Sequence, residues 1–355
     1  MKALVKYGYG RGETEIRDIP IPTIADDDLL IEVKAAGICG SDLAFHAGGH
    51  ENLLNPPVVL GHEFAGVVSQ VGKNVTGWRT GDRVVSDNTG YVCGKCYACG
   101  TANYLVCPER LGLGYGMDGG FASYVKVPGP VLLRNPQCLF VIPDGVSFEE
   151  AAILDPCCNA YKAVVQEGGL LPGEDLAVFG VGPLGLFAIQ VGRAAGAANI
   201  IAIGLEADRD RFVVARKLGA THALVADRED VAQRVKEITG NEGVAVVVDC
   251  AGPAIAVKQG IDILRNTGIL VKVGYDERPL GFSLDPVMDR AITIRGHYGY
   301  DYVSWTNCIR LVKAGLVDMK TMISHRLPLA DWEEGFRLTA QQKSIKVILL
   351  PEPPQ

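Results

Sequence analysis

Up to residue 150, hydrophobic positions occur in short runs that glycine and proline repeatedly interrupt. Short runs with frequent turn residues between them are typical of β-strands, and their irregular spacing argues against amphipathic helices. The pattern therefore predicts a β-rich, barrel-like unit, with strands expected at 29–35, 64–71, 83–85 and 121–127.

Beyond residue 150 the pattern changes to compact apolar runs separated by longer helix-like stretches. Strands are expected at 176–179, 200–203, 244–248 and 268–273. Helices are expected at 184–195, 210–218, 231–239 and 254–264. Strands that alternate with helices of this length predict βαβ units and a parallel sheet.

The last part of the chain has a helix-like stretch at 305–314 and a strand-like stretch at 345–350, before a proline-rich end. A chain of 355 residues is too long for one compact core, so two domains are expected. We expect the C-terminal segment to rejoin the first domain. The predicted division is 1–155 with 296–355 for the β-rich domain and 156–295 for the parallel-sheet domain, which makes an α/β fold.

Composition and charge narrow the classes of partner. Hydrophobic residues make up 48% of the chain and charged residues 21%, as in an ordinary globular protein. The net charge of −7 and the lack of dense lysine or arginine runs argue against nucleic acid as a partner. No window approaches about 18 uninterrupted apolar residues, and the N-terminus lacks the pattern of a signal peptide. We therefore expect a cytoplasmic protein with no membrane span.

A glycine-rich turn lies between a predicted strand and a predicted helix: Gly180-Val181-Gly182-Pro183-Leu184-Gly185. Glycine-rich turns end many parallel strands, but this position is the one that a dinucleotide-binding turn occupies. Gly180 permits the tight turn, Gly182 lets the backbone approach a pyrophosphate, and Gly185 lets the helix pack closely on the strand. Pro183 suits the first helical turn, where its missing N–H costs nothing. The backbone N–H groups that follow, beginning with that of Leu184, would face the phosphates.

The choice between NAD and NADP depends on a residue about twenty positions further on, at the end of the second strand. Glu206 occupies that position, and its carboxylate can accept hydrogen bonds from both ribose hydroxyls while repelling a 2′-phosphate. Arg209 and Arg211 follow closely and provide the charge that a 2′-phosphate would need. A solvated charge cluster is the alternative for all three residues. The acidic residue favours NAD.

Two groups of metal-binding residues are written close together in the sequence. Cys93, Cys96, Cys99 and Cys107 have the spacing C-x2-C-x2-C-x7-C. Four thiolates close a tetrahedron around Zn²⁺, which is typical of a structural site. Cys39 and His62 lack a close fourth partner, so a metal bound there recruits other ligands or water and keeps a position for substrate. A disulfide framework is the alternative for the four cysteines, but it is typical of small secreted domains.

The motifs occur in an order that is known from one family. Cys39-Gly40-Ser41-Asp42 and Gly61-His62-Glu63 come first, followed by the four cysteines, Gly81-Asp82-Arg83-Val84 and the glycine-rich turn. Over essentially its whole length the chain resembles the zinc-dependent medium-chain alcohol dehydrogenases. The resemblance implies a GroES-like catalytic domain with a Rossmann domain inserted between its two segments. The stretch Ala151-Ala152-Ile153-Leu154-Asp155-Pro156 is similar to the polyol and threonine dehydrogenase branch.

The same resemblance implies a catalytic zinc bound by Cys39 and His62, with Glu63 and Asp155 close enough to exchange with water or substrate. Together with the four cysteines, this makes about two Zn²⁺ ions per chain. A Lewis-acid metal lowers the pKa of a bound alcohol, and the hydride then passes to the nicotinamide of NAD.

Ser41 matches the hydroxyl that passes the alcohol proton onward in this family. The family often has a histidine five positions after the cysteine ligand, but that position here is Ala44. His46 is the candidate substitute, and a solvent-facing loop histidine is an equal alternative. Asp42 is expected to brace the turn that carries Cys39.

Asp155 in place of a cysteine ligand predicts a polar, negative pocket that suits neighbouring hydroxyls. We therefore expect an NAD-dependent oxidoreductase acting on a secondary alcohol of a polyol, sugar alcohol or cyclitol. L-Threonine 3-dehydrogenase is the next alternative, followed by a vicinal-diol dehydrogenase of the butanediol type. A non-catalytic, zinc-stabilised NAD(H) sensor is the alternative from another class. The family resemblance also implies a homo-oligomer, either a dimer or a tetramer.

Overall fold

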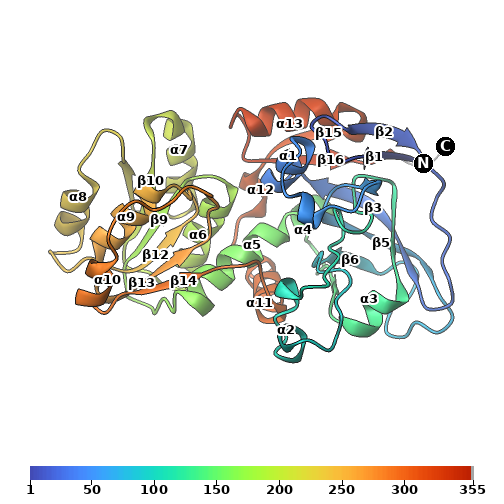
Figure 1. Cartoon of the computed structure of the whole chain (residues 1–355), viewed down its shortest axis with the longest axis horizontal. Coiled ribbons are helices and arrows are strands. Elements are labelled where there is room, and N and C mark those ends of the chain that lie inside the picture. Colours follow the sequence, from blue (N-terminus) through green and yellow to red (C-terminus); the bar gives the residue numbers. More distant parts are fainter. Residues whose placement is uncertain (353–355) are drawn as a thin grey trace. The chain divides into compact units, whose positions relative to one another are not determined.

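The computed structural model describes residues 1–352, and the chain divides into two compact units (Figure 1). Unit 1 consists of Met1–Asp155 and the chain from Met319 onward, and unit 2 is Pro156–Asp318. The sequence predicts a return to the first unit at residue 296, whereas in the structure unit 1 resumes at Met319. Helix α11 (Tyr302–Lys313) lies between residues 296 and 319 and belongs to unit 2. The side-chain amide of its Asn307 donates a hydrogen bond to the Tyr161 hydroxyl of the same unit at 3.0 Å.

Unit 2 contains a six-stranded sheet in which all neighbouring strands are parallel. In spatial order the strands are β11 (His222–Val225), β10 (Ile200–Gly204), β9 (Leu176–Phe179), β12 (Val244–Asp249), β13 (Leu264–Lys272) and β14 (Thr293–Gly296). The strands β9, β10 and β12 are buried along their whole length, as expected when helices cover both faces of a parallel sheet. The predicted α/β parallel sheet is therefore confirmed.

The helices of unit 2 follow the predicted alternation closely. They are α6 (Pro183–Ala194), α7 (Arg209–Leu218), α8 (Val231–Ile238), α9 (Ala254–Ile263), α10 (Asp285–Asp289) and α11, with the helical turns η3 (Lys162–Glu167) and η4 (Glu206–Asp208). The strands β11 and β14, the helix α10 and the turns η3 and η4 were not predicted. All four residues of β14 are exposed, so that edge strand has no apolar run by which a hydrophobic pattern could reveal it.

The strand order reverses at β9. The chain runs from β9 through β10 to β11 on one side, and then returns to β12, β13 and β14 on the other. In open parallel sheets, the connections on either side of such a reversal run in opposite directions, and a crevice forms between them at the carboxyl ends of the two central strands. The glycine-rich turn directly follows β9 and lies at this crevice.

Unit 1 is built from two sheets. The smaller one has the antiparallel order β2 (Thr14–Asp18), β1 (Lys2–Lys6) and β4 (Val58–Val59). The larger one has the order β15 (Ile323–Pro328), β16 (Lys346–Leu350), β3 (Leu29–Gly37), β5 (Glu63–Val71), β6 (Arg83–Ser86) and β8 (Leu139–Val141), with β7 (Tyr124–Val127) also paired to β3. The predicted β-rich character is confirmed, although the strand expected at 121–127 begins only at Tyr124.

Short helices and helical turns connect these strands. They are α1 (Gly40–His46), η1 (Glu51–Leu53), α2 (Tyr97–Gly100), η2 (Tyr104–Val106), α3 (Gly129–Arg134), α4 (Phe148–Ala152), α12 (Met319–Met322), η5 (Leu329–Asp331) and α13 (Trp332–Ala340). Helix α5 (Leu154–Tyr161) contains the boundary between the units. Phe45, Phe64 and Phe121 lie in one core cluster with strand residues of both sheets. None of the helices in residues 1–352 has the length and apolar character needed to span a bilayer.

Candidate metal centres and nucleotide site

Cys39, His62 and Glu63, called the Cys39 group below, offer ligand atoms that all lie within 4.8 Å of one another. The sheet register explains how they meet. Strands β3 and β5 are antiparallel, and Gly37 at the end of β3 pairs with Glu63 at the start of β5. Cys39 comes two residues after β3 and is the N-cap of α1, so its side chain faces the beginning of β5.

Two neighbours hold the imidazole of His62. Asp42 accepts a hydrogen bond from the Cys39 backbone N–H at 2.8 Å, which confirms that it braces the cysteine turn, and its other oxygen lies 3.4 Å from His62 Nδ1. Ser41 Oγ lies 3.4 Å from His62 Nε2. Burial alone would lower the pKa of His62, but the Asp42 carboxylate and the Cys39 thiol raise that pKa well above its ordinary value. The negative surroundings that favour a proton here also favour a metal cation.

Glu63 forms an ion pair that the sequence analysis missed. Lys346 Nζ lies 2.5 Å from Glu63 Oε2 and donates to the Ile38 carbonyl oxygen at 2.7 Å. Both side chains are almost completely buried, at 2% and 1% exposure. Burial alone would lower the pKa of Lys346, but Glu63 and then Cys39 raise it. The available signal was a single lysine at the start of an otherwise apolar strand, β16.

Asp155 lies outside the 4.8 Å group but close enough to be coupled to it electrostatically. Its Oδ2 accepts a hydrogen bond from the Asn88 side-chain amide at 2.6 Å. Burial and, after it, the Glu63 carboxylate raise the pKa of Asp155 to about 7. The structure therefore brings together Cys39, His62 and Glu63 as possible ligands, with Asp155 beside them.

The donor set fits zinc. A thiolate, an imidazole and a carboxylate are common zinc ligands, and three protein ligands with a fourth position for water or substrate are typical of a catalytic site. Asp42, Glu63 and Asp155 contribute three buried carboxyl groups, next to the buried side chains of Lys346 and His62. Buried anions without enough positive charge are costly, and a divalent cation would offset them.

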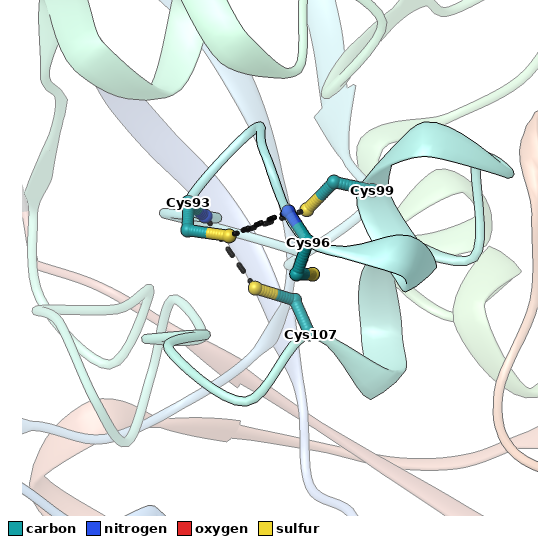
Figure 2. A group of neighbouring side chains, drawn as sticks. All are labelled: Cys93, Cys96, Cys99 and Cys107. Carbon is teal, nitrogen blue, oxygen red and sulfur yellow. Dashed lines mark hydrogen bonds between the residues drawn. The ribbon is translucent and has the colours of Figure 1, made fainter.

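The side chains of Cys93, Cys96, Cys99 and Cys107 point toward a common centre (Figure 2). Cys93 Sγ lies 3.9 Å from Cys99 Sγ, while the Cys93 backbone N–H donates to Cys107 Sγ at 3.4 Å. A backbone hydrogen bond from Lys95 lowers the pKa of the Cys93 thiol to about 6, whereas burial raises the pKa of the Cys99 thiol to about 12; a bound cation would favour the thiolate form of both. All ten cysteines are free, so the disulfide alternative is not supported. We call the chain segment 93–107 the cysteine lobe.

His46, the candidate substitute in the proton route, has a different surrounding. Its ring packs edge-on against Trp332 and Phe336 of α13, with centroids 5.5 and 5.8 Å away. Burial and the nearby Lys6 lower the pKa of His46. Among residues 1–352, no hydrogen bond joins His46 to Ser41 or His62. A role for His46 in proton transfer stays a prediction.

The glycine-rich turn has the backbone geometry that its sequence predicts. Gly180 has φ 87°, a left-handed conformation that favours glycine, and a Cβ there would lie 3.1 Å from the Ala251 backbone nitrogen. Gly182 is the N-cap of α6, and a Cβ added to it would meet nothing within 4 Å, so the backbone is open to a close ligand. Pro183 and Leu184 form the first turn of α6, and a Cβ on Gly185 would overlap the Gly180 carbonyl oxygen.

Glu206 follows β10, as the nucleotide prediction requires. Its carboxylate accepts hydrogen bonds from Arg209, of which the Nη2 contact measures 3.1 Å, and Arg228 Nε lies 4.0 Å away. The hydrogen bond from Arg209 lowers the pKa of Glu206, so the carboxylate is ionised. Arg211 lies 3.7 Å from Asp208 instead. The arginines therefore lie beside the predicted ribose position, and the Glu206 carboxylate there keeps its negative charge.

Comparisons with known proteins agree with this geometry. Residues 25–137 match the alcohol dehydrogenase GroES-like domain, and residues 183–314 match the zinc-binding dehydrogenase family. The chain is 44% identical to the uncharacterised zinc-type alcohol dehydrogenase-like protein YdjL of Escherichia coli, with 98% of each chain covered. It is 38% identical to L-threonine 3-dehydrogenase of Bacillus velezensis and 34% identical to sorbitol dehydrogenase of Halalkalibacterium halodurans, with 99% of each chain covered in both cases. The structure of 2R,3R-butanediol dehydrogenase from Bacillus subtilis matches with a TM-score of 0.89 and 30% identity, covering 99% of both chains.

Proposed function

This chain belongs to the zinc-dependent medium-chain alcohol dehydrogenases, a family of oxidoreductases, and on that premise we propose that it oxidises a secondary alcohol of a polyol, sugar alcohol or cyclitol with NAD. The observation that carries the proposal is the Cys39 group, in which His62 and Glu63 are buried, with the Asp155 carboxylate beside it. A substrate with adjacent hydroxyls offers further hydrogen-bond donors to these carboxylates, beside their Lys346 and Asn88 partners, whereas a bare hydrophobic alcohol offers none. A non-catalytic NAD(H) sensor is not retained, because the family is enzymatic.

Bound zinc would supply Lewis-acid polarisation of the substrate hydroxyl, and NAD would accept the hydride. Cys39 and His62 would hold the zinc, with Glu63 or Asp155 completing the set or giving way to substrate. The Lys346 ion pair holds Glu63 in place. Asp42 orients the His62 ring from its Nδ1 side.

Ser41 is the proposed acceptor of the alcohol proton. Its hydroxyl lies 3.4 Å from His62 Nε2, so it stands beside the predicted ligand nitrogen, where a bound substrate hydroxyl would be. The substrate hydroxyl loses this proton, and the carbon that bears the hydroxyl loses the hydride to NAD, which leaves a ketone. Because Ala44 has no proton-carrying side chain, the proton would leave Ser41 through water or toward His46.

For the nucleotide we propose the turn from Gly180 to Gly185 as the pyrophosphate site and Glu206 as the ribose acceptor. The support is the open backbone at Gly182 and the ionised carboxylate after β10. Arg211 would contact the adenosine side of the nucleotide once its weak pairing with Asp208 is exchanged. NAD is the proposed coenzyme.

L-Threonine is the second candidate substrate, since L-threonine 3-dehydrogenase of Bacillus velezensis is 38% identical to this chain. Steady-state kinetics with sorbitol, a cyclitol, L-threonine and 2,3-butanediol separates the candidates. The proposal predicts the highest kcat/KM for a polyol or cyclitol. A kcat/KM at least about tenfold higher for threonine than for any polyol, a difference of about 1.4 kcal/mol in transition-state binding, would replace the first substrate by the second.

We also propose that the chain forms a homo-oligomer in the cytoplasm. Strand β14 is an edge of the six-stranded sheet and exposes all four of its residues, so its free backbone groups can pair with another strand. Sedimentation velocity would report a mass of two or four chains if the proposal holds, and a single chain if it does not.

A further inference from the structure

Asn88 and Arg110 lie between the cysteine lobe and the Cys39 group, and neither carries a role so far. Arg110 belongs to the chain that leaves the lobe, because its backbone N–H donates to the Cys107 carbonyl oxygen at 3.1 Å. Its side chain reaches back to the loop that precedes the lobe. Nε donates to the Thr89 carbonyl oxygen at 3.0 Å, and Nη2 donates to Asn88 Oδ1 at 3.0 Å.

The arginine determines which way the Asn88 amide points. A guanidinium has only N–H donors, so the atom that faces it must be the amide oxygen. The Asn88 amino group is therefore directed to the opposite side, where it donates to Asp155 Oδ2 at 2.6 Å. A flipped Asn88 amide would place its amino group against the N–H groups of Arg110 and its oxygen against the Asp155 carboxylate. Both contacts are unfavourable.

The backbone around Asn88 is also held by hydrogen bonds that do not involve the lobe. Asp87 accepts hydrogen bonds from the Thr89 backbone N–H and hydroxyl, both at 2.9 Å, and from the Asn135 amide at 3.2 Å. Asn88 is 4% exposed and has φ 49°, a left-handed conformation that asparagine tolerates. The lobe contributes to this loop through the Arg110 side chain, which donates to the Asn88 side-chain oxygen and also to the Thr89 and Asn88 carbonyl oxygens.

A second contact leads from the same arginine toward the Cys39 group. The Arg110 guanidinium lies over the Tyr115 ring, 5.4 Å from its centroid, and the Tyr115 ring packs edge-on against His62 with centroids 5.9 Å apart. A single side chain, that of Asn88, thus separates Arg110 from Asp155, and a single side chain, that of Tyr115, separates Arg110 from His62. Removal of the guanidinium would loosen two neighbours of the Cys39 group while leaving every cysteine of the lobe in place.

We propose that Arg110 and Asn88 couple the two metal centres: the cysteine lobe holds Arg110, Arg110 orients the Asn88 amide, and Asn88 holds the Asp155 carboxylate toward the Cys39 group. The inference rests on the proposed function, since it assumes a metal at the Cys39 group. Arg110 and Asn88 are positioning residues, because they act through Asp155. Zinc in the lobe therefore affects the second centre as well as the local fold.

The test measures zinc release to a chromogenic chelator from the full-length protein. Two phases are expected, and Cys39→Ser identifies the phase of the Cys39 group by removing it. Arg110→Met keeps the length of the side chain but removes its donors, and Asn88→Gly removes the amide from a position where glycine tolerates the backbone. Mutation of a residue that holds a metal ligand typically lowers metal affinity by about 10- to 100-fold. Each variant should therefore raise the rate of zinc release from the Cys39 group by a factor in that range. The lobe phase should stay unchanged.

Arg134→Met is the matched control. Arg134 is also an arginine bonded next to the lobe, to the Val92 carbonyl oxygen at 3.1 Å and to the Tyr91 hydroxyl, but not to Asn88 or Asp155. It should leave the release rate of the Cys39 group at the wild-type value. In the double variant Arg110→Met/Asn88→Gly the rate increase should be smaller than the product of the two single increases, because both changes break the path through Asn88, while only the Tyr115 contact depends on Arg110 alone.

Two outcomes overturn the coupling: equal release from Arg110→Met and the control, or effects that add in the double variant. The latter would mean that Arg110 loosens the protein by another route. Failure of the proposed function is distinguishable from these. In that case the wild-type protein would show only the lobe phase, and Cys39→Ser would change nothing.

Discussion

The cysteine lobe and the Cys39 group differ in how their residues come together. The four cysteines of the lobe all lie in one segment, Cys93 to Cys107, and their thiols are close enough together to bind one metal ion. The Cys39 group joins the end of β3 to the start of β5, with Asp155 and Lys346 contributed from much further along the sequence. A centre with four thiolates is closed and stabilises a fold, whereas one assembled from unlike donors keeps a position for substrate. The predictions below test that division.

The largest expected effect is on catalysis at the Cys39 group. Cys39→Ser or His62→Ala should lower kcat by at least about a thousandfold, because Lewis-acid polarisation is worth several kcal/mol. Steady-state kinetics with the best polyol measures this loss. The control is the binding of NAD, which should be unchanged because the glycine-rich turn is in unit 2. A variant that keeps wild-type turnover would show that these residues are not ligands.

The reverse pattern is expected in the lobe. Cys96→Ser or Cys99→Ser should reduce the free energy of unfolding of unit 1 by about 4 kcal/mol, in the range that follows loss of a structural metal. Urea unfolding followed by tryptophan fluorescence measures it, with Cys138→Ser at a buried cysteine outside the lobe as the comparison. If the lobe variants unfold at the wild-type urea concentration and have lost their zinc, the lobe is not a stabilising centre.

A smaller effect is expected at Asp155. Asp155→Ala should weaken zinc binding at the Cys39 group by about 10- to 100-fold, whether the carboxylate binds the metal directly or through water. Competition with a chelator of known affinity gives the value. Asp155→Asn keeps the size of the side chain and separates the loss of charge from the loss of packing. Wild-type zinc affinity and wild-type kinetics in both variants would reduce Asp155 to a scaffold residue.

The smallest effect concerns neither metal centre. Glu206→Ala should shift the ratio of NAD to NADP affinity toward NADP by about tenfold, since a hydrogen bond to a charged group contributes about 1.5–3 kcal/mol. Binding of both coenzymes, followed by nucleotide fluorescence, provides the ratio, and zinc content should not change. An unaltered ratio would mean that the flanking Arg209 and Arg228 determine the specificity instead.

The same contrast explains what could be predicted from the sequence. The lobe, the glycine-rich turn and the alternating elements of unit 2 depend on residues close together in the chain, and their spacing alone predicts them. Lys346 and Asn88 could not be identified in this way, because each acts on a residue far away in sequence, Glu63 and Asp155. The pairing of Lys346 with Glu63 depends on the register of β16, β3 and β5, and that of Asn88 with Asp155 on how the loop after β6 meets the start of α5; a single sequence specifies neither.

Secondary structure shows the same limit. Strands β9 and β12 are fully buried, so their apolar runs predict them, whereas β14 is fully exposed and leaves no hydrophobic pattern. Strand β7 begins at Tyr124 rather than residue 121, since Phe121 bonds through its backbone N–H to the Leu60 carbonyl oxygen and not to β3. Tertiary contacts, not local preference, decide such boundaries.

Zinc content by native mass spectrometry, compared between the wild-type chain and Cys39→Ser, tests most directly whether there is a second, open metal centre beside the cysteine lobe. About two zinc ions are expected per wild-type chain and about one in the variant, because only the centre with the incomplete ligand set depends on Cys39. A single zinc in both proteins would contradict it.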